Sequence, residues 1–147
     1  MMYRNILVPT DGSPGSERAI DLAVGLAARF HARVTSIYVV PEGVPTLFSG
    51  GKLYGSGVIS AQIRNAIRKA AAEALDAVAR KADKAGVRHA SRRTTARAPW
   101  QAIARAARTA NCDLIVMATH GRRGLGALGS QTLKTVAHSP VPVLVCR

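Results

Sequence analysis

CDLIVMATHGRRGLGALGSQT, residues 112–132, carries the clearest indication of fold class in this chain. Its first part, Asp113 to Ala118, is a short apolar run that predicts a buried strand. A loop with four glycines follows and leads directly into a predicted helix; these are Gly121, Gly124, Gly126 and Gly129. In an open α/β sheet, ligands bind beyond the carboxyl ends of the strands, where helix N-termini attract anions. The loop is therefore either an anion-binding loop or only a tight connection.

A second strand-to-helix transition, NILVPTDGS, lies at residues 5–13. Asn5 to Pro9 is an apolar run typical of a strand that is buried on both faces. Ser13 is a suitable N-cap, and a proline fits the next position, so apolar residues at helical spacing predict a helix from Pro14 to His31. The β-branched run from Arg33 to Val40 predicts the next strand, which completes one right-handed strand–helix–strand unit.

The same alternation continues through the rest of the chain. The stretch from Pro41 to Gly57 is rich in glycine and proline and predicts a long loop, either a lid or a tolerated insertion. The later predicted elements are a helix from Val58 to near Gly86, an arginine-rich edge strand from Val87 to Ala96, a helix from Pro99, the strand from Asp113, a helix from Ser130 to His138 and a strand from Val143 to Cys146. This order predicts a single α/β domain over residues 1–147, with a doubly wound, five-stranded parallel sheet and helices on both faces.

The composition suits a globular protein, because 48% of the residues are hydrophobic and 20% are charged. No run approaches the length of a membrane helix and the start lacks a signal-peptide pattern, so we expect a cytoplasmic protein without a membrane partner. The two cysteines, Cys112 and Cys146, have no zinc-type spacing, and we expect both to act as small buried hydrophobic residues.

Charge is the unusual feature, since 21 basic residues stand against 8 acidic ones and the formal net charge is +13. Such an excess favours polyanionic partners such as nucleotides or nucleic acids. The basic residues are not interleaved with aromatic ones and form no reading motif for nucleic acid. A solvated basic surface and a nucleic-acid partner therefore both remain open.

The glycine loop contains a literal dinucleotide-binding fingerprint and one histidine, and neither predicts an enzyme active site. GLGALG, residues 124–129, matches the dinucleotide fingerprint literally, but the chain ends before the acidic residue that should follow about 20 positions later. His120 has no nucleophile or carboxylate placed beside it by a motif, so we expect a loop-shaping or phosphate-side role. We predict no catalytic residue and, for any bound nucleotide, at most slow hydrolysis.

Taken together, NILVPTDGS, DLIVMATHGRRGLGALGS and HSPVPVLVCR resemble the universal stress protein family over essentially the whole chain. The resemblance implies the strand order 3-2-1-4-5. That order places the topological switch between the first and fourth strands, so Asp11 and the glycine loop would face one crevice. It also implies a homodimer in which the last strand pairs with its copy across a two-fold axis.

The resemblance further implies an ATP site, with Mg²⁺ able to accompany the phosphates. One group would line the base and the ribose, and a second group would hold or flank the phosphates. The first group is Pro9, Thr10, Asp11, Val39 and Met117; the second is His120, Gly121, Arg122, Gly129, Ser130 and Thr132.

The glycine loop departs from the pattern G-x2-G-x9-G-S/T of the nucleotide-binding members. Ala118 stands where the first glycine belongs, and only residues 122–128 separate Gly121 from Gly129. An added methyl hinders close approach of backbone to phosphate, and a shorter loop moves the amides that would hold it. Two alternatives therefore stay open, a homodimeric stress protein that acts through protein partners without nucleotide and a nucleic-acid-associated protein.

Overall fold

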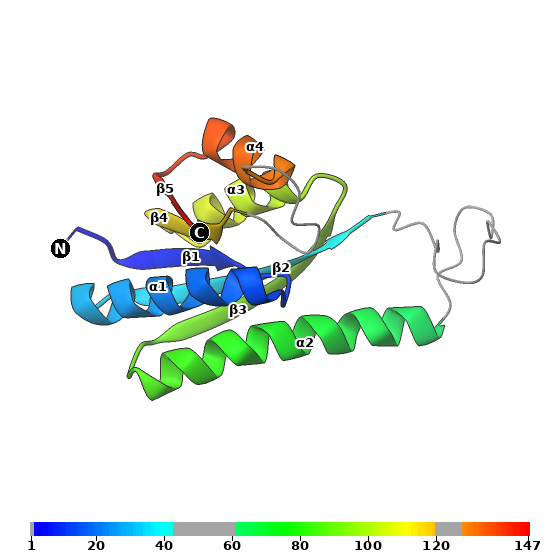
Figure 1. The fold of residues 1–147 in the computed structure, drawn as a ribbon, viewed down its shortest axis with the longest axis horizontal. Helices are drawn as coiled ribbons and strands as arrows, with labels where there is room; N and C mark the ends of the chain where they lie inside the picture. Colours follow the sequence, from blue (N-terminus) through cyan, green and yellow to red (C-terminus); the bar gives the residue numbers. More distant parts are fainter. Residues whose placement is uncertain (1, 43–60, 120–127) are drawn as a thin grey trace.

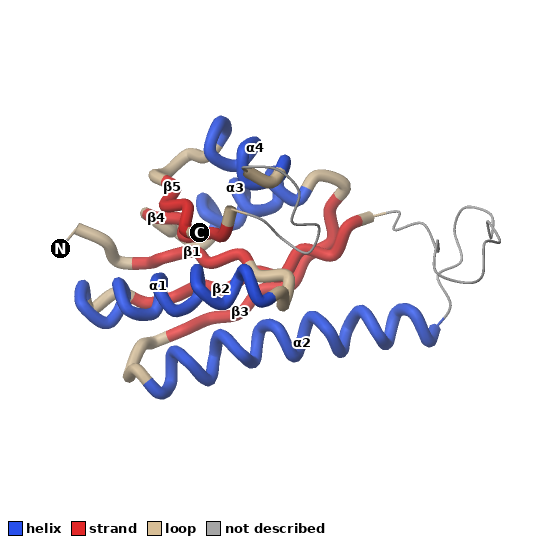
Figure 2. Tube along the Cα trace, viewed as in Figure 1, coloured by secondary structure: helices blue, strands red, loops and turns tan. Residues whose placement is uncertain are grey.

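Five parallel strands form one sheet in the order β3-β2-β1-β4-β5, as the resemblance implies (Figures 1 and 2). The structure is a computed structural model and describes residues 2–42, 61–119 and 128–147. The elements are β1 (Asn5–Pro9), α1 (Pro14–Phe30), β2 (Arg33–Pro41), α2 (Ala61–Lys84), β3 (His89–Ala96), α3 (Pro99–Thr109), β4 (Leu114–Ala118), α4 (Ser130–His138) and β5 (Val143–Cys146). The predicted order of strands and helices is confirmed.

Helices cover both faces of the sheet, with α1 and α2 on one side and α3 and α4 on the other (Figure 1). The α1 side is packed with residues such as Ile6, Val8 and Val78, and the α3 side with Leu7, Ile103 and Ile115. Successive residues of β1 thus point into opposite cores, which is why this strand is a continuous apolar run rather than an alternating one.

Local sequence explains where the helices begin and end. Ser13 occupies the N-cap position of α1 and Pro14 follows it, as predicted. Pro99 likewise stands in the first turn of α3. The turn after α2 contains Gly86 at φ +67°, a left-handed conformation that glycine adopts without steric cost. Val87 then returns into the core, so β3 begins two residues later than predicted.

Trp100 and His138 form an aromatic contact between two helices. The Trp100 side chain is half-buried and its ring lies against the imidazole of the exposed His138, with centroids 4.7 Å apart. The contact joins the first turn of α3 to the last turn of α4.

Among the described helices, none combines the length and the apolar character needed to span a bilayer.

Candidate functional site

The junction of β1 and β4 brings two ends of the sequence to one edge of the sheet. The parallel pairing aligns Ile6 with Leu114 and Leu7 with Ile115. Continuing this register places Pro9 level with Met117. The carboxyl ends of β1 and β4 therefore lie side by side, at the edge where open α/β sheets bind ligands.

The turn after β1 is tightly held by hydrogen bonds. Thr10 is buried, and its backbone N–H donates to the carbonyl of Ile37 on β2 at 3.0 Å. Gly12 has φ +77°, which allows the chain to reverse towards α1. The Asp11 carboxylate accepts a 2.9 Å bond from the N–H of Ser13. Asp11 thus has a structural role in this turn, and that role is compatible with a ligand contact.

Ser13 also contributes a hydroxyl group at this edge, although the sequence predicted only an N-cap role for this residue. Its side chain makes no capping bond to α1. The hydroxyl is buried and has no hydrogen-bond partner within residues 2–42, 61–119 and 128–147. Because buried polar atoms are normally paired, an orphaned hydroxyl beside Asp11 is an unusual feature that calls for an explanation.

An apolar wall lies on the α3 side of this edge. Met117 is buried in the cluster that Leu7, Ile37 and Ile103 share, and Val39 packs against that cluster while remaining partly exposed. Pro9 is also partly exposed, at the end of β1. The structure therefore brings three of the residues expected to contact base or sugar to one end of β1, β2 and β4.

The N-terminus of α4 faces the same edge. Gly129 is its N-cap, and the Gly129 N–H donates to the carbonyl of Thr119 at 2.7 Å, which fixes the helix start just beyond β4. No described side chain caps this helix, and Ser130 is exposed. The first-turn amides and the positive end of the helix dipole remain suited to an anion.

Thr132 and Gln131 hold α4 in place. Thr132 is buried and its hydroxyl donates to the carbonyl of Ala118 at 3.0 Å, so its proton is not directed at a ligand in this structure. The Gln131 Oε1 atom accepts a 3.1 Å bond from the backbone N–H of Trp100 at the start of α3. The sequence carried no signal for this second contact, which links residues from different helices.

Three predicted site residues, His120, Gly121 and Arg122, lie outside the described residues, as do most of the Pro41 to Gly57 loop and the predicted start of α2 at Val58. Among the described residues, no group of three or more His, Cys, Asp or Glu side chains is arranged to hold a metal ion. Any Mg²⁺ would depend on nucleotide phosphates for most of its ligands.

Comparison with known proteins agrees with this architecture. Residues 2–147 match the Universal stress protein family. A universal stress protein from Methanocaldococcus jannaschii is 32% identical over 148 residues, covering 99% of this chain and 83% of the relative. The structure of universal stress protein UspA from Lactobacillus plantarum has a TM-score of 0.80 and 27% identity, covering 100% of this chain and 99% of that one.

Two further structures with this fold contain a nucleotide. One is a universal stress protein in complex with cAMP, with a TM-score of 0.73, 24% identity and coverage of 100% and 99% of the two chains. The other, from Archaeoglobus fulgidus, is in complex with dAMP, with a TM-score of 0.72, 19% identity and coverage of 100% of both chains. By the family match over residues 2–147, this chain belongs to the universal stress protein family.

Proposed function

We propose that residues 1–147 act as a single cytoplasmic stress-response module that binds ATP at the carboxyl ends of β1 and β4. The observation that carries the proposal is the presence of two features at this edge: the N-terminus of α4, which no described side chain caps, and the Ser13 hydroxyl, which has no partner among the described residues. The helix N-terminus suits phosphate, and the hydroxyl suits a polar ligand atom. The cAMP and dAMP complexes of proteins with the same fold support an adenine nucleotide as the ligand class.

The proposed residues divide into four roles. Pro9, Val39 and Met117 offer apolar contact to the base and the sugar. Asp11 offers carboxylate oxygens to the ribose, since a carboxylate accepts hydrogen bonds from hydroxyl groups. The buried Thr10, whose hydroxyl accepts the Gly12 N–H, holds the turn that presents Asp11. Ser130 offers its amide and hydroxyl donors to the phosphates, which Mg²⁺ accompanies. Gly129, the N-cap of α4, has its own N–H bonded to the Thr119 carbonyl and positions Ser130. Thr132 acts by keeping α4 against β4.

The test is calorimetric titration of nucleotide-stripped protein with ATP and Mg²⁺. Asp11→Asn retains an oxygen that can accept the Ser13 N–H bond, so the turn survives while the charge is lost. Its matched control is Asp76→Asn on the exposed surface of α2, which changes the net charge equally. We expect saturable binding to the wild type and to Asp76→Asn, and about 10-fold or greater weakening in Asp11→Asn.

The absence of binding heat at millimolar ATP would contradict the proposal, as would equal affinities of the two variants. Absence of binding would favour the alternative in which the protein acts through partners without nucleotide, whereas equal affinities would indicate that ATP binds away from Asp11. The matched control is needed because the chain has a formal net charge of +13, which attracts any polyanion independently of a specific site.

We also propose that the chain forms a two-fold homodimer through β5. This strand is an edge of the sheet, with one side of its backbone available for pairing. Large apolar side chains are exposed on β5 and on the adjacent α4: Leu144 is 39% exposed, Leu133 56% and Val136 45%. A second copy of the chain would cover both the open edge and this apolar surface.

A further inference from the structure

A pocket lies at the amino-terminal ends of β2 and β3, at the opposite edge of the sheet from the proposed nucleotide site. It has a volume of about 560 Å³ and lies beside the turn that joins α2 to β3. Its lining residues are Arg33, Asp83, Gly86, Val87, Arg88, His89 and Ala90. This volume is in the range of small-molecule sites, and two of the lining residues are arginines.

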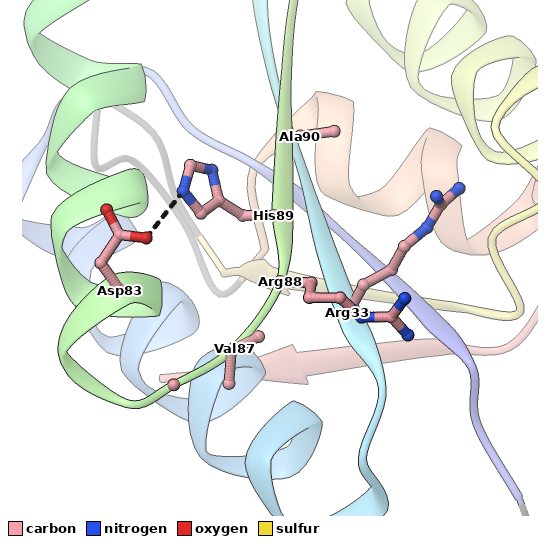
Figure 3. Close-up of a pocket in the computed structure, with 7 residues that line it drawn as sticks. Arg33, Asp83, Val87, Arg88, His89 and Ala90 are labelled. Carbon is pink, nitrogen blue, oxygen red and sulfur yellow. Dashed lines mark hydrogen bonds and ion pairs between the residues drawn. The ribbon is translucent and has the colours of Figure 1, made fainter.

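Arg33, the first residue of β2, and Arg88, the residue before β3, are direct neighbours. The Val34 N–H donates to the Arg88 carbonyl at 2.9 Å, and Val34 aligns with His89 in the parallel register. The two preceding residues are therefore also side by side. Figure 3 shows both arginine side chains on the same side of the strands, away from Asp83 and His89. Like charges at such positions repel each other.

Among the described residues, no carboxylate lies within ion-pair distance of either guanidinium. The Arg33 guanidinium donates to the neutral carbonyl of Ala110 at 3.3 Å. The Arg88 side chain makes no hydrogen bond or ion pair with any residue that the structure describes. Asp83 pairs instead with the imidazole of His89 at 3.1 Å, on the other side of β3 (Figure 3).

Arg92 extends the positive charge along the same face of β3. It lies four residues after Arg88, and side chains of a strand return to the same face every second residue. Its guanidinium donates to the neutral Thr109 hydroxyl on α3 at 3.2 Å. This face is surrounded by β2, β3 and α3. None of these three elements contains an aspartate or a glutamate.

We propose that this pocket binds a phosphate group, held by the guanidinium groups of Arg33 and Arg88, with Arg92 adding positive charge. Guanidinium forms two parallel hydrogen bonds to phosphate, and a bound anion would remove the repulsion between the two neighbouring arginines. The phosphate belongs either to a small free polyphosphate or to the backbone of a nucleic acid. The site is independent of the proposed ATP site.

The first experiment uses inorganic pyrophosphate as the probe, with calorimetry and thermal unfolding at low salt. Arg88→Gln is the test variant, and Arg68→Gln on the exposed surface of α2 is its charge-matched control. We expect pyrophosphate to bind the wild type and Arg68→Gln, and to bind Arg88→Gln at least about 10-fold more weakly. Without anion, Arg88→Gln should melt no lower than the wild type, because it removes a repulsion.

The second arm distinguishes the source of the phosphate with a fluorescent single-stranded oligonucleotide. A loss of affinity in Arg88→Gln, but not in Arg68→Gln, for the oligonucleotide alone assigns the pocket to a nucleic-acid backbone. The same loss for pyrophosphate alone assigns it to a small anion. Equal affinities of the two variants for both probes would overturn the proposal.

The Asp11→Asn variant tests whether the arginine pocket is distinct from the proposed ATP site. We expect this variant to bind pyrophosphate through the arginine pocket as the wild type does. Pyrophosphate binding that depended on Asp11 and not on Arg88 would overturn the arginine pocket while leaving the proposed ATP site intact.

Discussion

The hydroxyl of Thr35 on β2 donates a 2.9 Å hydrogen bond to the Oδ1 atom of Asn5 on β1, and both side chains are buried. The Asn5 amide completes the arrangement by donating to the carbonyl of Ala110, just after α3, at 2.8 Å. Two strands and a helix end are thereby joined by polar contacts inside an apolar core. Such a contact favours one register of β1 against β2, because a shifted register would leave polar atoms unpaired.

Thr35→Val should lower the free energy of unfolding by about 1–3 kcal/mol, because it leaves the buried Oδ1 of Asn5 without a donor. Chemical denaturation measures this directly. The matched control is Thr95→Val on the exposed strand β3, which should change stability by less than about 0.5 kcal/mol. Equal effects of the two substitutions would show that the buried contact does not contribute as the geometry indicates.

Substitution of Ser130 should mainly weaken ATP binding, whereas substitution of Thr132 should mainly lower stability. Ser130 is exposed, so Ser130→Ala should leave the melting temperature unchanged and weaken ATP binding about 3- to 10-fold by removing one phosphate donor. Thr132 is buried and bonded to Ala118, so Thr132→Val should lower stability by about 1 kcal/mol and weaken ATP binding less. Calorimetry and thermal unfolding of both variants test the division, and an unchanged ATP affinity in Ser130→Ala would contradict it.

Leu144→Asp should convert the proposed dimer to a monomer, because a carboxylate buried against a second copy without a partner is strongly unfavourable. Light scattering against concentration gives the mass of each species. Ala72→Asp introduces the same charge on the exposed surface of α2 and should leave the dimer intact. A wild-type protein that scatters only as a 15.5 kDa species would rule out the dimer.

Burial raises the pKa of the Cys112 thiol above its ordinary value. The folded protein therefore retains the thiol proton at a pH where the unfolded chain has lost it. This contribution to stability is fully present below the ordinary thiol pKa and is lost as the pH rises through the folded value. Denaturation of the wild type and Cys112→Ala between about pH 8 and about pH 11 should show the steeper decline in the wild type. Parallel curves would contradict this coupling.

Much of the fold could be predicted from local sequence alone. Asn5 to Pro9 reads as a buried strand because both of its faces contact a core, and Pro14 and Pro99 mark helix starts because they need no backbone donor there. Strand boundaries shifted by one or two residues: β4 begins at Leu114 and β3 begins at His89, after the turn at Gly86. The order of the strands came from the family resemblance.

The sequence by itself determined which segments are strands and helices, because burial on one or two faces leaves a local pattern. Only the tertiary structure decided which distant residues meet. The bond of Gln131 to Trp100, the inward hydroxyl of Thr132 and the adjacency of Arg33 and Arg88 all depend on how separate elements pack. A local pattern records how deeply a residue is buried but not its partner, so contacts between elements that are distant in the chain require the folded arrangement.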